Sequence, residues 1–106
     1  MVPYSRRLFS QQGVTDPTVC FTVPPGQVWI VRSIDCYCGA PLVSSQLIFK
    51  EYENSAAFLS FTTEAGTSRS FQWEGRQVFE AGQSLEADPA DHAWDIRVSG
   101  YELAGA

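Results

Sequence analysis

The chain has 106 residues, a length that predicts one domain with a core of moderate size. Twelve acidic against seven basic side chains give a formal net charge of -5, and the basic residues are dispersed apart from Arg6 and Arg7. Nucleic acid is therefore disfavoured as a partner, because binding it needs a concentrated positive surface. The sequence has no long apolar run and no apolar leader, which predicts no membrane partner and synthesis in a cytoplasm.

Residues 1–17 are predicted to form an N-terminal arm or an edge strand. Residues 4–9 have an extended pattern, and turn-forming residues follow at 11–13 and 16–17. Residues 18–23 are rich in β-branched and aromatic side chains, which favours a strand. The strand should end at residues 24–26, Pro-Pro-Gly, because proline cannot donate a hydrogen bond to a sheet.

Residues 27–38 alternate between two faces, as a strand does. Arg32 interrupts the face that is otherwise apolar, which indicates either the rim of the core or a β-bulge. We expect the core face to consist of Val28, Ile30, Ile34, Cys36 and Cys38, and the opposite face of Trp29, Val31, Ser33, Asp35 and Tyr37.

Two hairpin-connected strands are predicted within residues 42–53 and 57–62. A helix over residues 56–61 is compatible with propensity, but the flanking Ser and Thr residues and the short length favour a strand. Residues 65–68 are predicted as a turn. A strand over residues 69–74 should follow, with a bend at Gly75 before residues 76–79.

A glycine-glutamine turn occurs twice, at residues 26–27 and 82–83, each time between two apolar runs. Residues 84–87 are predicted as a short strand, closed by Asp88 and Pro89, and residues 92–103 have the clearest two-residue period in the chain. Trp94, Ile96 and Val98 lie on one face of this last strand, and Asp95, Arg97 and Ser99 on the other.

About eight to nine short strands predict an all-β protein, a single-domain β-sandwich or jelly roll. Residues 18–106 would form the sandwich. The repeated turn is typical of two similar hairpin units that face each other across one core.

The three cysteines, an odd number, indicate free thiols. Cys20, Cys36, Cys38 and His92 could nominally bind zinc, but two cysteines separated by one strand residue diverge, whereas zinc sites usually use a Cys-x-x-Cys turn. An enzyme with a cysteine nucleophile would need His92 as its base. We expect buried thiols, no catalytic residue, no metal and no cofactor.

Two further sets of side chains, one of aspartates and one of aromatic residues, are candidate binding sites. Asp88, Asp91 and Asp95 lack the spacing of an EF-hand, so ordinary turn chemistry is favoured over calcium binding. A stacking platform for sugars, as in a carbohydrate-binding module, is the alternative to burial for a set of four aromatic side chains: Trp29, Tyr37, Trp73 and Trp94.

Three blocks of sequence carry a family resemblance. Residues 23–34 place a proline-glycine turn before a Trp-containing strand, residues 73–85 place Trp-Glu-Gly-Arg before the second glycine turn, and residues 98–103 contain Ser-Gly-Tyr. In this order the blocks resemble small virion proteins of tailed bacteriophages that infect actinobacteria. The resemblance spans residues 18 to 103, with departures at Pro24, Cys36 and Cys38.

The resemblance implies a non-enzymatic structural protein of the virion, made in the host cytoplasm. We expect a capsid decoration protein that forms a homotrimer or another symmetric oligomer, binds the major capsid protein and stabilises the shell. The alternatives are a minor tail or head-tail component that binds tail proteins, a carbohydrate-binding module, and a small enzyme. The predicted docking segment, with a plain edge strand as the alternative, consists of Tyr4, Arg6, Arg7, Leu8 and Phe9.

Overall fold

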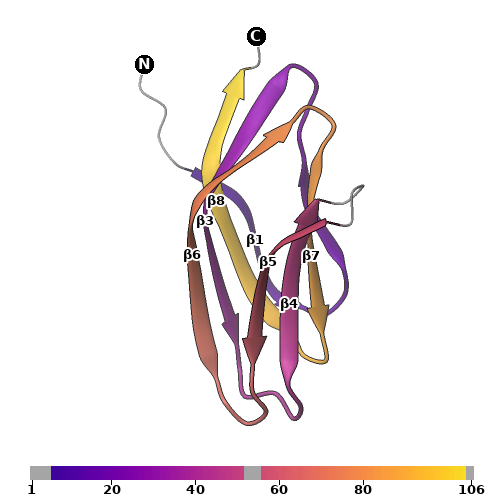
Figure 1. Cartoon of the computed structure of the whole chain (residues 1–106), viewed down its shortest axis with the longest axis vertical. Helices are drawn as coiled ribbons and strands as arrows, with labels where there is room; N and C mark the ends of the chain where they lie inside the picture. Colours follow the sequence, from indigo (N-terminus) through magenta and orange to yellow (C-terminus); the bar gives the residue numbers. More distant parts are fainter. Residues whose placement is uncertain (1–5, 52–55, 105–106) are drawn as a thin grey trace.

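The fold consists of eight strands in two four-stranded antiparallel sheets (Figure 1). The computed structural model describes residues 6–51 and 56–104. The prediction of an all-β sandwich is confirmed. The strands are β1 (Arg6–Val14), β2 (Thr18–Thr22), β3 (Gln27–Cys38), β4 (Ser45–Glu51), β5 (Ala56–Thr63), β6 (Arg69–Glu80), β7 (Ser84–Ala90) and β8 (Trp94–Ala104).

The strand order is that of a jelly roll. The first sheet has the order β1-β8-β3-β6 and the second has the order β2-β7-β4-β5. The first strand therefore pairs with the last, the second with the seventh, the third with the sixth and the fourth with the fifth, as in one long hairpin folded over itself. Residues 6–14 of the expected arm or edge strand form β1, which lies at the edge of the first sheet.

A β-bulge in β3 changes which side chains face the core. The pairing of β3 with β8 and β6 shifts between Val31 and Ser33, and Arg32 between them is exposed. The bulge that the sequence indicated is confirmed, and the expected core face holds only in part before it. Trp29 and Val31 contact the core cluster because one extra residue reverses the alternation, whereas Val28 is half-buried and Ile30 is buried outside that cluster.

The core lies between the sheets and is dominated by Trp94, which is completely buried. The indole Nε1–H of Trp94 on β8 donates to Ser45 Oγ on β4 at 2.9 Å, and the Ser45 hydroxyl donates in turn to the carbonyl oxygen of Ala90. This chain of hydrogen bonds joins the two sheets and satisfies the polar atom of the largest buried side chain. The predicted inward face of the last strand is confirmed, with Trp94, Ile96 and Val98 all buried.

The two glycine-glutamine turns are equivalent and lie side by side. Gln27 N donates to Pro24 O and Gln83 N donates to Glu80 O, at 3.3 and 3.0 Å. The residue before each glutamine is a glycine, with φ of 78° and 86° respectively, as a type II turn requires. The turns are linked to each other, because Gly82 N donates to Val23 O and Val23 N donates to Gln83 O.

Several strand boundaries differ from expectation: β1 continues to Val14 through residues 11–13, where a turn was expected, and β8 begins at Trp94. Residues 42–44 lie outside any strand, and β4 begins at Ser45. β6 continues through Gly75, where an added Cβ would lie 2.6 Å from the Trp73 ring. β7 continues through Pro89, which lies opposite Leu47 on β4 and beyond Ala87, the last residue of β7 that pairs with β2.

Candidate functional site

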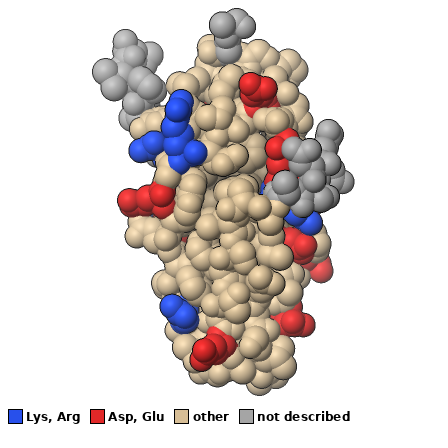
Figure 2. All heavy atoms as spheres, in the orientation of Figure 1, with Lys and Arg blue, Asp and Glu red and all other residues tan. Residues whose placement is uncertain are grey.

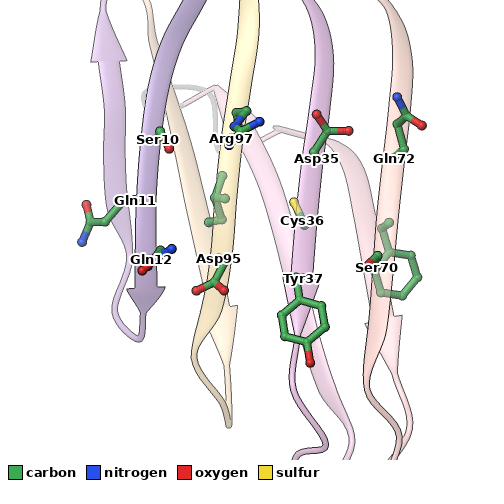
Figure 3. Close-up of a pocket in the computed structure, with 12 residues that line it drawn as sticks. Ser10, Gln11, Gln12, Asp35, Cys36, Tyr37, Ser70, Gln72, Asp95 and Arg97 are labelled. Atoms are coloured by element: carbon green, nitrogen blue, oxygen red, sulfur yellow. The ribbon is translucent and has the colours of Figure 1, made fainter.

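A groove of about 480 Å³ lies on the outer face of the first sheet (Figure 3). It crosses all four strands of that sheet and includes Cys36, Tyr37 and Asp95, each of which the sequence offered as a member of a different candidate site. We call it the outer groove. Its lining residues are Ser10, Gln11 and Gln12 of β1, Asp95, Ile96 and Arg97 of β8, Asp35, Cys36 and Tyr37 of β3, and Ser70, Phe71 and Gln72 of β6.

One row of polar side chains crosses the groove at Asp35. Its neighbours across the sheet are Arg97 on β8 and Gln72 on β6, and Ser10 on β1 lies opposite Arg97. Residues directly opposite each other in an antiparallel pair share a face, with Cβ atoms about 4.5–5.5 Å apart. Even so, the side chains of Asp35 and Arg97 form no ion pair or hydrogen bond with any described residue.

A second row crosses the groove at Tyr37, which lies opposite Asp95 on β8 and Ser70 on β6. The Tyr37 side chain is 44% exposed, and its ring lies over Gly39. Asp95 is held in place because the backbone N–H of Gly13 donates to its Oδ1 at 2.9 Å. The second carboxylate oxygen of Asp95 forms no hydrogen bond within the described part of the chain.

The charged lining of the groove comprises two carboxylates and one guanidinium, from Asp35, Asp95 and Arg97. Their formal charges add to -1. Acidic side chains are also spread along the length of the face drawn in Figure 2. The groove therefore offers both donors and acceptors while its net charge disfavours anions.

The three cysteines are free, and Cys36 and Cys38 are buried as expected. Burial raises the pKa of the Cys20 thiol to about 12, and burial also raises the pKa values of Cys36 and Cys38 above the ordinary thiol value. All three thiols are thus protonated near neutral pH, which is unfavourable for a nucleophile or a metal ligand. The described residues contain no group of His, Cys, Asp and Glu side chains arranged to hold a metal ion.

The three aspartates weighed as calcium ligands lie apart. Asp88 on β7 forms an ion pair with Lys50, with 3.5 Å between Asp88 Oδ2 and Lys50 Nζ, whereas Asp95 faces the outer groove of the other sheet. Asp91 has a φ of 68° in the turn between β7 and β8, next to His92. The turn chemistry expected for Asp91 is confirmed, since aspartate tolerates this left-handed conformation.

The tryptophans do not form an outer stacking platform. Trp94 is buried, and Trp29 and Trp73 are partly buried against the core. Trp29 packs on Phe21 with a ring-centroid distance of 4.9 Å, and its Nε1–H donates to Gln27 Oε1. Of the four aromatic side chains weighed as a platform, only Tyr37 is both exposed and in the groove.

Only the first part of the predicted docking segment that the structure describes is exposed. Leu8 and Phe9 pack against the core, whereas Arg6 and Arg7 are exposed. The Arg6 Nε atom lies 3.5 Å from the Glu102 carboxylate on β8. Tyr4 lies outside the described residues.

An exposed apolar loop tip lies between β3 and β4, at the opposite end of the molecule from the last residues of β8 (Figure 1). Leu42 is 96% exposed and Val43 is 53% exposed. The base of this loop is fixed, because Gly66 N donates to Pro41 O at 2.7 Å and Ala40 N donates to Ser68 Oγ at 3.0 Å. Pro41 itself is buried. We call Leu42 and Val43 the apolar tip.

No protein-family model and no curated protein matches the sequence. The core of the Drosophila protein NLP, described in connection with pentamer formation and histone binding, is similar in structure, with a TM-score of 0.51 and 13% identity over 95% of this chain and 97% of that one. A Bacillus endospore appendage protein, from disulfide-linked pili, aligns with a TM-score of 0.44 and 10% identity over 99% of this chain and 88% of that one. In the described residues, no helix is long and apolar enough to span a membrane. At such low identity the likeness to the NLP core concerns the fold alone.

Proposed function

We propose that this chain is a non-enzymatic structural protein of a phage virion, and specifically a capsid decoration protein that binds the major capsid protein as a symmetric homo-oligomer. The three sequence blocks that resemble those of phage virion proteins support the class of protein. The observation that carries the docking role is the apolar tip, where adjacent leucine and valine side chains project from a fixed loop.

The geometry of the tip favours a protein partner. A singly exposed apolar residue is common on protein surfaces, but here two large side chains are adjacent and the loop that carries them is held by two hydrogen bonds to residues 66–68. A loop fixed before binding loses less conformational entropy in a complex. Such a tip suits insertion into an apolar pocket, and several copies on one oligomer would multiply the affinity.

The chemistry of the buried thiols and the fold add support. The protonated state of Cys20, Cys36 and Cys38 argues against the cysteine-dependent enzyme that the sequence left open. The NLP core, which has the same type of fold, is described as forming pentamers, so symmetric assembly is compatible with this architecture.

The first experiment locates the protein in the virion. We expect it to co-purify with filled heads, and we expect virions without it to lose DNA sooner on heating or osmotic shock. Gold labelling of the tail tip together with unchanged shell stability would contradict the decoration role and favour the minor tail alternative.

The second experiment tests the apolar tip. We expect Leu42→Asp combined with Val43→Asp to abolish binding of the purified protein to heads that lack it. Ala65→Asp is the matched control, because Ala65 is exposed in the neighbouring turn at the same end. Equal binding by both variants would exclude the tip as the docking element.

A further inference from the structure

We propose that the outer groove binds a neutral saccharide. The inference goes beyond the structural role above and does not depend on it. It rests on three features of the groove: polar groups left without partners, an exposed aromatic ring, and a charge balance that disfavours anionic ligands.

The first feature is the Asp35–Arg97 pair. The two residues lie directly opposite on neighbouring central strands, where opposite charges would ordinarily stabilise each other. Neither side chain forms an ion pair or hydrogen bond with a described residue. Both side chains line the groove, so the carboxylate oxygens of Asp35 and the guanidinium nitrogens of Arg97 are available to hydrogen-bond a ligand there (Figure 3).

The second row of the groove adds a fixed acceptor and an aromatic surface. Gly13 N–H orients the Asp95 carboxylate and leaves its other oxygen available. Tyr37, opposite Asp95, exposes an aromatic ring beside these polar atoms. A pyranose matches this arrangement, because each hydroxyl both donates and accepts hydrogen bonds while the ring C–H groups can cover an aromatic surface.

Charge and shape select against other ligands. Two carboxylates against one guanidinium disfavour phosphates, carboxylates and nucleic acids. A peptide would need a pocket for an apolar anchor or a free sheet edge, and this groove lies on the face of a sheet with Tyr37 as its only exposed large apolar side chain. The groove volume of about 480 Å³ lies within the range of small-ligand sites, roughly 300–1,000 Å³.

The test uses amide NMR spectra of the full chain titrated with five neutral probes: cellohexaose, laminarihexaose, maltohexaose, mannohexaose and xylohexaose. At least one probe should shift amide signals of β3 and β8 around Asp35, Tyr37, Asp95 and Arg97, with saturable binding. Tyr37→Ala and Asp35→Asn should each weaken that binding at least tenfold.

Gln46→Ala is the matched control, because Gln46 is an exposed polar residue on the second sheet. It should leave the affinity unchanged. If Tyr37→Ala alters the fold, as judged by its amide spectrum, Arg97→Gln takes its place. The proposal is overturned if no probe shifts these signals, if the shifts map elsewhere, if the groove variants bind as well as the control, or if heparin or a phosphopeptide binds the groove and the neutral probes do not.

Discussion

The two faces of the first sheet differ in chemistry, although the same strands form both: the inner face is buried and apolar, and the outer face is polar and exposed to solvent. On the inner face, Cys36 of β3 and Trp94 of β8 are buried, and the one polar atom of Trp94 has a hydrogen-bond partner. On the outer face, Asp35 and Arg97 from the same two strands remain without partners. The inner face therefore fixes the fold, while the outer face leaves polar side chains without partners inside the protein.

The largest effect should come from the centre of the inner face. Trp94→Ala should lower the free energy of unfolding by about 3–5 kcal/mol, because it removes the largest buried side chain and leaves a cavity. Urea denaturation followed by circular dichroism measures this loss. Trp94→Phe, which keeps most of the volume but not the indole N–H, should lose less. A loss below 1 kcal/mol for Trp94→Ala would contradict the central role of this side chain.

The hydrogen bond between the sheets should have the next largest effect. Ser45→Ala removes the acceptor of the buried Trp94 N–H, which should cost about 1–3 kcal/mol in the same denaturation experiment. Ser44→Ala is the matched control, because Ser44 is the exposed neighbour in the sequence. Equal stability of the two variants would show that the indole N–H finds another partner.

The buried thiols should make the protein unstable in alkali. Burial raises the pKa of the Cys36 thiol in the folded protein above its value in the unfolded chain. The folded state therefore has its full stability below the ordinary thiol pKa of 9.0, and the free energy of unfolding falls as pH rises above that value. Each such thiol contributes a slope of about 1.4 kcal/mol per pH unit in this range.

Cys36→Ala isolates this contribution. The variant should show a shallower fall in unfolding free energy between pH 9 and pH 10.5 than the unmodified chain, by about 1.4 kcal/mol per pH unit. Titrations of Lys and Tyr side chains are common to both chains and cancel in the comparison. Parallel curves would mean that the Cys36 thiol ionises in the folded protein as easily as in the unfolded one.

The smallest effect on stability should come from the outer face. Asp35→Asn should change the free energy of unfolding by less than about 0.5 kcal/mol, because its carboxylate has no internal partner to lose, and Tyr37→Ala by less than about 1 kcal/mol, because it removes a ring that is 44% exposed. The same variants should lose saccharide binding, which would separate the role of this face from that of the core. A loss of stability comparable to that of Ser45→Ala would instead assign these residues a structural role.

Much of the fold could be predicted from local pattern. The alternation in residues 94–98 identified the buried face of β8 correctly, and the glycines at positions 26 and 82 marked two turns that do require positive φ. Before the bulge in β3, the same reasoning placed Val28 and Ile30 on the core face, but the side chains that contact the core cluster are those of Trp29 and Val31. Arg32 gave a signal of the bulge, but its effect on Trp29 and Val31 depends on pairing with β8 and β6.

The candidate sites were harder to predict. The sequence pattern correctly placed four side chains on faces opposite to the core: Asp35 and Tyr37 of β3, and Asp95 and Arg97 of β8. Nothing in either segment of sequence indicates that these two strands are neighbours. The apolar tip was read as the start of a strand, because a short apolar run has no periodicity to distinguish a strand from a loop. Trp29 and Trp73 were weighed for an outer platform that the inward packing of both side chains excludes.

Local sequence pattern is enough to predict the all-β class, the turns and most of the inward-facing side chains, because these depend on interactions between residues close in the chain. The jelly-roll order, and the register that places Asp35 opposite Arg97 some 60 residues away in sequence, emerge only when the strands pair. Cross-strand neighbours arise from long-range pairing, and a shift of one residue would send each of these side chains to the other face. The outer groove therefore exists only because β1, β8, β3 and β6 pair in this register.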